Sequence, residues 1–328
     1  MSIIDGFKAK VSGKHLKVVF PEGNDERIIQ AARKLKDENI AEPIVLGKPE
    51  QIEEAIKKAG VNLNGITVIN PAESGKIDAY AEKYVGNRDD ITIGIAKRMV
   101  TKPLFYGGMM VACGDADTMV AGVATATATV IQAGTLAIGL AEGINTPSSF
   151  FLMIVPDVLG EKNKPFIYAD CAVNIDPTAE QLADIALASA NSGAKLLGDT
   201  PRVAMLSFST KGSASHAKVD KVLAALKIAR ERNASLAIDG EFQVDSAIVP
   251  RVAAKKVKSE SAVAGKANVL IFPDLDSGNI AYKLTQYTAN AKAIGPFLQG
   301  FAKPISDLSR GASADDVVST AIITLAQR

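Results

Sequence analysis

The sequence has no tryptophan, only two cysteines and only two histidines in 328 residues. Two cysteines in a chain of this size do not make the disulfide framework of a small secreted protein, and they fit a reducing cytosol. His15 and His216 are far apart in the sequence and lack the spacing of metal ligands. This argues against a zinc site and against a histidine-based triad, so no metal site is predicted.

The chain also lacks an excess of charge of one sign and a long apolar run. A formal net charge of +1 argues against broad binding to nucleic acids or anionic membranes, which requires a clustered basic surplus. No apolar run approaches the ~20 residues of a membrane span. The first residues lack the apolar segment of a signal peptide. We therefore predict a cytoplasmic protein in which any anion site is built locally.

Short apolar runs alternate with helical patterns in the first part of the chain. Strands are predicted at 16–20, 43–46 and 66–69, with helices after Asp25 and over 51–59. This alternation is typical of parallel βαβ units and predicts an α/β fold. Since 328 residues exceed what one hydrophobic core usually fills, two lobes are expected.

The rest of the chain continues the alternation of strands and helices. A polar helical segment is predicted at 79–99, with Arg88 and Arg98 exposed, and a loop at 156–164. A change of composition near 145–150 indicates a boundary between lobes. The further predicted strands are 116–122, 149–155, 166–169, 201–208, 236–240 and 267–273.

Polar residues follow several of these strands, where ligands of α/β proteins bind. Ser209, Lys211 and Gly212 follow one strand, and residues 274–279 follow another and lead into a helix. Thr125 and Thr127 stand at a helix start, which suits anion binding, although an N-cap with close packing of small residues is a commoner explanation of such a sequence. These loops and residues 306–316 together predict one cleft.

Residues 306–316 concentrate polar side chains ahead of an apolar-periodic helix. Arg310 is suited to bidentate capture of phosphate or carboxylate, and Asp316 could accept a proton from a group held there. Two structural alternatives stay open. Asp316 forms a capping-box pattern with Ser313, which sequence alone favours over catalysis. Arg310 could instead make a salt bridge between lobes.

Two other candidates for chemistry have simpler structural explanations. Cys171 follows a strand and stands beside Asp170, but no histidine is near it in sequence, so a buried structural thiol is predicted. Asp274 and Asp276 could hold a metal, although carboxylates in a turn more often cap it.

Motifs through almost the whole chain resemble the phosphate acetyltransferase family. They share the family's order along the sequence, and together they are specific. They are Phe20-Pro21-Glu22, residues 169–173, 205–209 with 212–214, 239–247, 263–275 with 277–280, 294–300, and Pro304 with 307–311.

The resemblance implies a reaction and an architecture. The reaction is acetyl-CoA plus phosphate to acetyl phosphate plus CoA, reversibly, as in acetate metabolism. The implied fold is a two-lobed α/β/α architecture like that of isocitrate and isopropylmalate dehydrogenases, with the active site in the inter-lobe cleft, usually as a homodimer. The first lobe would be discontinuous, comprising 1–145 and 300–328, and the second would be 146–299.

The resemblance also implies roles for individual residues. Asp316 would deprotonate the CoA thiol, Ser309 would hydrogen-bond the reacting carbonyl or thiol, and Arg310 would bind the phosphoryl group. Coenzyme A would be a substrate, and no metal or permanently bound cofactor would be required. The expected substrate-binding residues are Arg88, Thr125, Thr127, Ser209, Lys211, Gly212, Asn279, Tyr282 and Lys283.

The sequence departs from the family pattern at two positions. Gln132 and Tyr287 stand where relatives usually carry arginines associated with CoA or substrate anions, and Arg88 matches the family arginine only through a gap. These changes could weaken CoA binding, indicate another acyl group, or be compensated by a residue such as Lys283. A phosphate butyryltransferase-like enzyme and a non-catalytic acetyl-CoA-sensing domain are therefore the alternatives, whereas no nicotinamide site of a dehydrogenase is identified.

Overall fold

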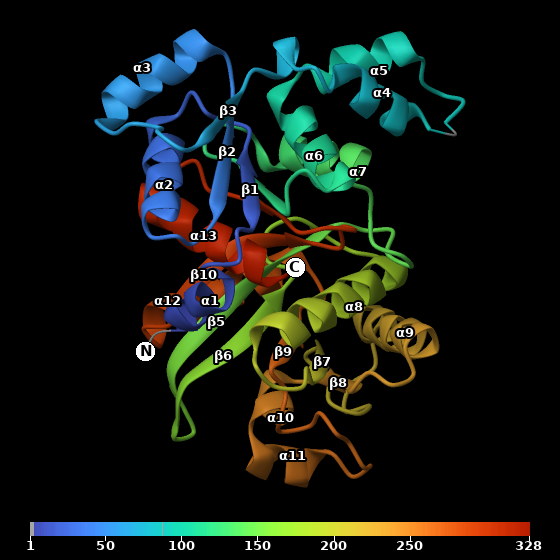
Figure 1. Ribbon diagram of the computed structural model, residues 1–328. Helices are drawn as coiled ribbons and strands as arrows, with labels where there is room; N and C mark the ends of the chain where they lie inside the picture. The colour runs from blue at the N-terminus through green and yellow to red at the C-terminus, as the bar shows by residue number, and fades with distance from the viewer. Residues whose placement is uncertain (1–2, 87) are drawn as a thin grey trace. The chain divides into compact units, whose positions relative to one another are not determined.

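The computed structural model describes residues 3–86 and 88–328 and forms two compact units. The first contains the described residues up to Ala141 together with Phe301–Arg328, and the second contains Glu142–Gly300. Each unit is built on its own sheet, and Figure 1 labels most of their elements. Within the described residues, no helix combines the length and the apolar character needed to cross a bilayer.

The sheet of the first unit is entirely parallel, with strand order β11-β4-β1-β2-β3. Its central strands are short apolar runs with buried side chains, as expected when helices cover both faces of a parallel sheet. The strands are β1 (Lys17–Phe20), β2 (Glu42–Leu46), β3 (Thr67–Ile69), β4 (Thr118–Ala121) and β11 (Ile305–Asp307).

Two groups of helices cover this sheet. Helix α2 packs against α13, α6 packs against α7, and Figure 1 shows these pairs on opposite sides of the strands. The helical elements are α1 (Ile3–Val11), α2 (Glu26–Asp37), α3 (Pro49–Ala59), the 3₁₀ turn η1 (Pro71–Glu73), α4 (Ile77–Val85), α5 (Ile93–Val100), α6 (Pro103–Cys113), α7 (Thr127–Ala137) and α13 (Ala314–Ala326).

The helix predicted after Asp25 is confirmed, and Asp25 is its N-cap residue. Its side chain accepts a hydrogen bond from the Arg27 amide and caps the helix. One face of this helix, which includes Ile28 and Leu35, is apolar and buried.

The single helical segment predicted at 79–99 is wrong, because two helices occupy this region. Helix α4 ends at Gly86, where φ is +46°, and α5 begins after Thr92, whose hydroxyl accepts from the Ile95 amide. A glycine with positive φ followed by a new N-cap ends one helix and starts another. Arg88 and Arg98 are exposed, as predicted.

The second unit has a mixed sheet with strand order β10-β5-β6-β9-β7-β8. β10 and β6 run antiparallel to β5, and the other pairings are parallel. Helices α8 and α9 pack together against this sheet. The elements are β5 (Ser148–Val158), β6 (Glu161–Ala169), α8 (Ala179–Leu196), β7 (Val203–Leu206), α9 (Ala217–Arg232), β8 (Ile238–Phe242), α10 (Val244–Ile248), α11 (Pro250–Lys256), β9 (Val269–Ile271), α12 (Leu275–Thr288) and β10 (Lys292–Gln299).

The loop predicted at 156–164 is wrong, because β5 and β6 continue through it as one long hairpin (Figure 1). Leu159 and Gly160 have positive φ and form the turn. The strands beside the turn are polar because they extend beyond the core. Asp157 pairs with Lys162 across the strands at 2.5 Å.

The core of the second unit contains Cys171, as predicted for a structural thiol. It packs among large apolar side chains that include Phe151 and Phe242. Its side chain is fully buried and unpaired, and burial raises its pKa well above the ordinary value. A thiol in this state is not a nucleophile near neutral pH.

Candidate active site

Three neighbouring strands of the first unit end at the same edge of the sheet. β11, β4 and β1 are adjacent and parallel, so the residues that follow them lie close together. β1 leads to Glu22, β4 leads to the 122–126 loop, and β11 leads to the 308–313 loop. The 308–313 loop contains Ser309 and Arg310, so the predicted catalytic segment lies where ligands of parallel α/β sheets usually bind.

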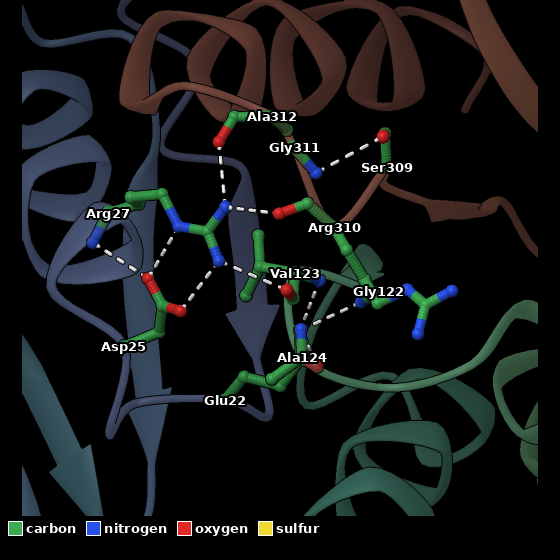
Figure 2. Close-up of polar contacts among 10 residues, drawn as sticks. All are labelled: Glu22, Asp25, Arg27, Gly122, Val123, Ala124, Ser309, Arg310, Gly311 and Ala312. Atoms are coloured by element: carbon green, nitrogen blue, oxygen red, sulfur yellow. Dashed lines mark hydrogen bonds and ion pairs between the residues drawn. The ribbon is translucent and has the colours of Figure 1, made fainter.

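Glu22 binds the backbone of the 122–126 loop through its carboxylate. Glu22 is only 6% exposed, and its carboxylate accepts hydrogen bonds from the amides of Gly122 at 2.7 Å and of Val123 and Ala124 at 3.0 Å (Figure 2). Three charge-assisted bonds to successive amides fix the path of this loop. They also satisfy a carboxylate that would otherwise be costly to bury.

Gly122 permits the two loops to approach each other. Its φ is +113°, and a Cβ at this position would lie 2.3 Å from Asp307 Oδ1 and 2.6 Å from the Leu308 amide nitrogen. No other residue type fits this contact without a shift of backbone. The glycine at the end of the predicted strand is therefore required by close packing against the segment that carries Ser309.

Arg27 joins both loops to the start of α2. Its guanidinium donates to the carbonyl oxygens of Arg310 at 2.8 Å, Ala312 at 2.9 Å and Val123 at 3.0 Å (Figure 2). The same group forms an ion pair with Asp25 at 2.8 Å, and this hydrogen-bonded pairing lowers the pKa of Asp25. No pattern in the sequence indicated these contacts.

Ser309 and Arg310 are both exposed on this loop. The Ser309 hydroxyl accepts from the Gly311 amide at 3.2 Å. The Arg310 guanidinium points away from Arg27 (Figure 2), and none of the described residues forms a hydrogen bond or ion pair with it. Its backbone is fixed while its side chain keeps five donors available, which is the arrangement that an anion-binding arginine requires.

Asp316 occupies the first turn of α13, where it completes the capping box predicted with Ser313. Its Oδ2 accepts from the Ser313 amide at 2.9 Å and from the Ser313 hydroxyl at 2.8 Å, and Ser313 accepts from the Asp316 amide at 3.2 Å. The structural role is therefore present. Asp316 is also exposed, so capping does not remove the carboxylate from solvent or from a ligand. Its role as a base stays a prediction.

The threonines beside this loop differ in their contacts. Thr127 begins α7 and donates its hydroxyl to Asp307 Oδ2 at 2.5 Å, while Thr125 is partly exposed in the 122–126 loop. The cap position of α7 is Ala126, and no side chain caps the helix there. The N-cap explanation of these threonines is thus wrong, and a helix start without a side-chain cap lies beside Arg310's loop.

Asp307 is a buried carboxyl two residues before Ser309. It is 3% exposed, and its Oδ1 has no hydrogen-bond partner among the described residues. Burial raises its pKa to about 6, the Thr127 hydroxyl opposes this shift, and the nearby Glu22 carboxylate adds to it. Asp307 is therefore a carboxyl whose charged form is destabilised in the folded protein.

Asp307→Asn is expected to make the protein more stable at pH values above about 6. Folding raises the pKa of Asp307 from 3.8 to about 6, so wild-type stability falls as pH rises through this range and stays lower above it. The asparagine variant does not lose this stability, because its side chain does not ionise. Its melting temperature should exceed that of the wild type by a few degrees near pH ~7.5 and by little near pH ~4. A difference that is the same at both pH values would contradict this explanation.

In the second unit, Ser209, Lys211 and Gly212 surround two buried carboxylates. The Ser209 hydroxyl and the Gly212 amide each donate to Glu241 Oε1 at 2.8 Å. The Lys211 ammonium contacts Asp239 and the Gly240 carbonyl, each at 2.6 Å. These candidates therefore share one cluster, in which Ser209 is buried and Lys211 already has two partners.

Asn279, Tyr282 and Lys283 lie together on α12. Asn279 donates to the Cys171 carbonyl at 3.1 Å, and the Tyr282 ring stacks on Phe151 with centroids 4.0 Å apart. Lys283 is exposed, with its ammonium 5.1 Å from the centre of the Tyr282 ring. Its charge is thus available on the surface of this helix.

The capping explanation for residues 274–276 is confirmed for Asp274, whose side chain accepts from the Ser277 amide and caps α12. Asp274 also lies 3.6 Å from Lys218. No group of histidines, cysteines and carboxylates suited to a metal ion occurs among residues 3–86 and 88–328.

Arg88 lines a pocket of about 400 Å³ in the first unit. Its guanidinium lies 4.4 Å from the centre of the Tyr84 ring, and Lys83 and Lys303 also line the pocket. The Lys303 ammonium donates to the Val111 carbonyl at 2.7 Å. Three cations therefore converge on one pocket, of which the sequence had indicated only Arg88.

The two positions that depart from the family pattern are both exposed. Gln132 lies on α7, and Tyr287 lies near the end of α12 with 81% of its surface accessible. Neither substitution has a structural role that would explain the loss of an arginine.

Comparisons with known proteins agree over the full chain. The family model described as "Phosphate acetyl/butaryl transferase" matches residues 2–325. A phosphate acetyltransferase of Acetivibrio thermocellus is 43% identical, covering 100% of this chain and 98% of the relative. One of Thermoanaerobacterium thermosaccharolyticum is 45% identical, with coverage of 100% and 99%. The crystal structure of a phosphotransacetylase from Streptococcus pyogenes has a TM-score of 0.91 and 44% identity, covering 100% of this chain and 99% of that chain.

Proposed function

The chain belongs to the phosphate acetyltransferase family, and on that basis we propose that Ser309, Arg310 and Asp316 carry out its reaction. The protein is an acyltransferase that moves an acetyl group reversibly between coenzyme A and inorganic phosphate. The observation that supports the assignment most directly is Arg310, whose backbone is held by Arg27 while its guanidinium has no partner in the described chain.

The proposed mechanism is direct transfer. Asp316 takes the proton of the CoA thiol, whose ordinary pKa is about 8.5, so that a base is needed near neutral pH. The thiolate sulfur attacks the carbonyl carbon of acetyl phosphate, the new C–S bond forms, and the C–O bond to phosphate breaks. Arg310 balances the charge on the phosphate oxygens, and Ser309 hydrogen-bonds the reacting carbonyl or thiol.

Arg88 and its pocket are proposed to bind an anionic part of coenzyme A. The support is the convergence of Lys83, Arg88 and Lys303 on one pocket, which places three cationic side chains around an anion bound there. We propose further substrate contacts at three other places. These are Thr125 and Thr127 at the start of α7, the cluster around Lys211, and the cluster on α12. Coenzyme A is a substrate here, and the proposal includes no permanently bound cofactor.

Turnover of acetyl-CoA tests the activity itself. When the purified protein is mixed with acetyl-CoA, thiol release is expected only after phosphate is added, without any added metal. Release without phosphate would indicate hydrolysis, and no release would leave the acetyl-CoA-sensing alternative. Butyryl-CoA in the same assay tests acyl preference, and we expect the acetyl substrate to be used faster.

The two compact units are proposed to be the two domains of a fold like that of isocitrate and isopropylmalate dehydrogenases. The chain is an α/β protein with one parallel and one mixed sheet, and it matches the phosphotransacetylase structure over its full length. We also propose a cytoplasmic location, which is supported by the two cysteines being free thiols.

A homodimer is proposed as well, because one face of α12 is apolar and exposed. Ile280, Leu284 and Tyr287 are 63%, 59% and 81% exposed, and their spacing places them on one side of the helix. A second copy of the chain would cover this face. Light scattering should give the mass of a dimer for the wild type and of a monomer for Leu284→Glu. A monomeric wild type, or a variant that stays dimeric, would contradict this interface.

A further inference from the structure

Arg27 uses every donor of its guanidinium. Nε and Nη2 donate to Asp25, Nη2 also donates to Val123 O, and Nη1 donates to Arg310 O and Ala312 O. A salt bridge that served only the start of α2 would need Asp25 alone. The three remaining bonds all end on backbone carbonyls of the 122–126 and 308–313 loops (Figure 2).

We propose that Arg27 is a positioning residue for acetyl transfer, which fixes the backbone of Arg310 so that its guanidinium meets the phosphate in one orientation. This role rests on the proposed function, in which Arg310 binds the phosphoryl group. Glu22 fixes the neighbouring 122–126 loop through three amides. Arg27 therefore connects the loop that carries Arg310 to a loop that is already fixed. Arg310 itself has no other backbone contact of this kind from α2.

Lysine cannot replace Arg27 in this role. The guanidinium is a planar fork that donates in three directions at once, whereas an ammonium on a flexible stem is a single point of charge. In Arg27→Lys the Asp25 pair can persist, but the three carbonyls cannot all be held. A displacement of about 1 Å at a reacting group can cost ~10²-fold in rate, so we expect kcat to fall by roughly 10- to 100-fold.

The decisive experiment combines Arg27→Lys with Arg310→Lys in a double-mutant cycle. The cycle is measured as kcat/KM for acetyl phosphate, which both single changes are expected to lower. If Arg27 acts through Arg310, the double variant should be little worse than Arg310→Lys alone, because each change removes the same oriented contact. Losses that multiply would overturn the proposal, and so would an Arg27→Lys enzyme with unchanged kcat. Full activity of Arg310→Lys would instead overturn the proposed site, and with it this role of Arg27.

Two control variants separate positioning from general stability. Arg33→Lys changes an arginine on the same helix that contacts Asn64 O and Asp37, and it should leave kcat unchanged. Asp25→Asn removes the charge of the ion pair but can still cap α2, and its kcat should stay within a few-fold of the wild type. A loss in Asp25→Asn equal to that in Arg27→Lys would assign the effect to the ion pair and overturn the proposal.

A second variant covers the case in which Arg27→Lys does not fold. Arg27→Gln leaves no unpaired cation, and its activity should rise when millimolar guanidinium is added, because the ion can occupy the space of the missing group. Folding of each variant is checked by its melting temperature. A folded Arg27→Gln enzyme with wild-type kcat, or one that guanidinium does not reactivate, would count against the role.

Discussion

Asp316→Asn is expected to lower turnover by roughly 10²–10⁴-fold, the usual contribution of a general base. The amide cannot accept the thiol proton. Its oxygen can still accept from the Ser313 amide and hydroxyl, so the capping box and the stability of α13 should largely persist. Initial rates of acetyl phosphate formation and thermal melting, measured on the same preparation, check both parts of this result.

Two neighbouring variants distinguish catalysis from capping. Asp315→Asn changes the adjacent carboxylate, whose side chain is 79% exposed and pairs with Lys34, and it should keep normal turnover. Ser313→Ala removes the capping hydroxyl and should cost about 1 kcal/mol of stability with a much smaller loss of turnover. If Ser313→Ala loses as much activity as Asp316→Asn, the capping role explains Asp316 completely.

Arg310→Lys should raise the KM for phosphate and acetyl phosphate by roughly 10- to 100-fold, since a bidentate charge-assisted contact is worth about 1.5–3 kcal/mol. The ammonium keeps the charge but loses the planar fork. Steady-state kinetics in both directions measure the effect. Arg98→Lys, an exposed arginine on α5, is the matched control and should be neutral. Unchanged affinity for both anions in Arg310→Lys would assign this arginine a purely structural role.

The sequence predicts most elements that form the two sheets, because buried parallel strands are continuous apolar runs. It fails for elements that lack a continuous apolar run, both outside the core and inside it. The 156–164 hairpin is polar on both strands, so its pairing through contacts such as Asp157 with Lys162 has no hydrophobic period to reveal it. Helix α6 is absent from the prediction because Gly107 and Gly108 disfavour a helix. In the structure a Cβ on Gly108 would lie 2.7 Å from Ala137 Cβ, so the glycine permits close packing against α7.

The candidate site was also predicted only where its residues form a local sequence pattern. Ser309, Arg310 and Asp316 lie in one continuous segment of the chain, so the sequence alone is enough to predict that they form one site. Glu22 and Arg27 could not be found in this way. The bond from Arg27 to the Arg310 carbonyl joins residues 283 positions apart, and it exists only because β1, β4 and β11 end at the same edge of one parallel sheet. A single sequence carries no local sign of such a contact.

The proposed direct attack by the CoA thiolate excludes an acetyl-enzyme intermediate. Cys171, the cysteine that the sequence made a candidate for chemistry, is fully buried, and its raised pKa makes it a poor nucleophile. An enzyme that transferred the acetyl group to itself would release phosphate before coenzyme A binds. The order of these events can therefore be measured without any variant.

The most direct measurement is the exchange of radiolabelled phosphate into acetyl phosphate by the wild-type enzyme, with and without coenzyme A. Direct transfer predicts that label enters acetyl phosphate only when coenzyme A is present, because the C–O bond breaks only as the thiolate attacks. Exchange at a comparable rate without coenzyme A would require an acetyl-enzyme and would contradict the roles given to Asp316, Ser309 and Arg310.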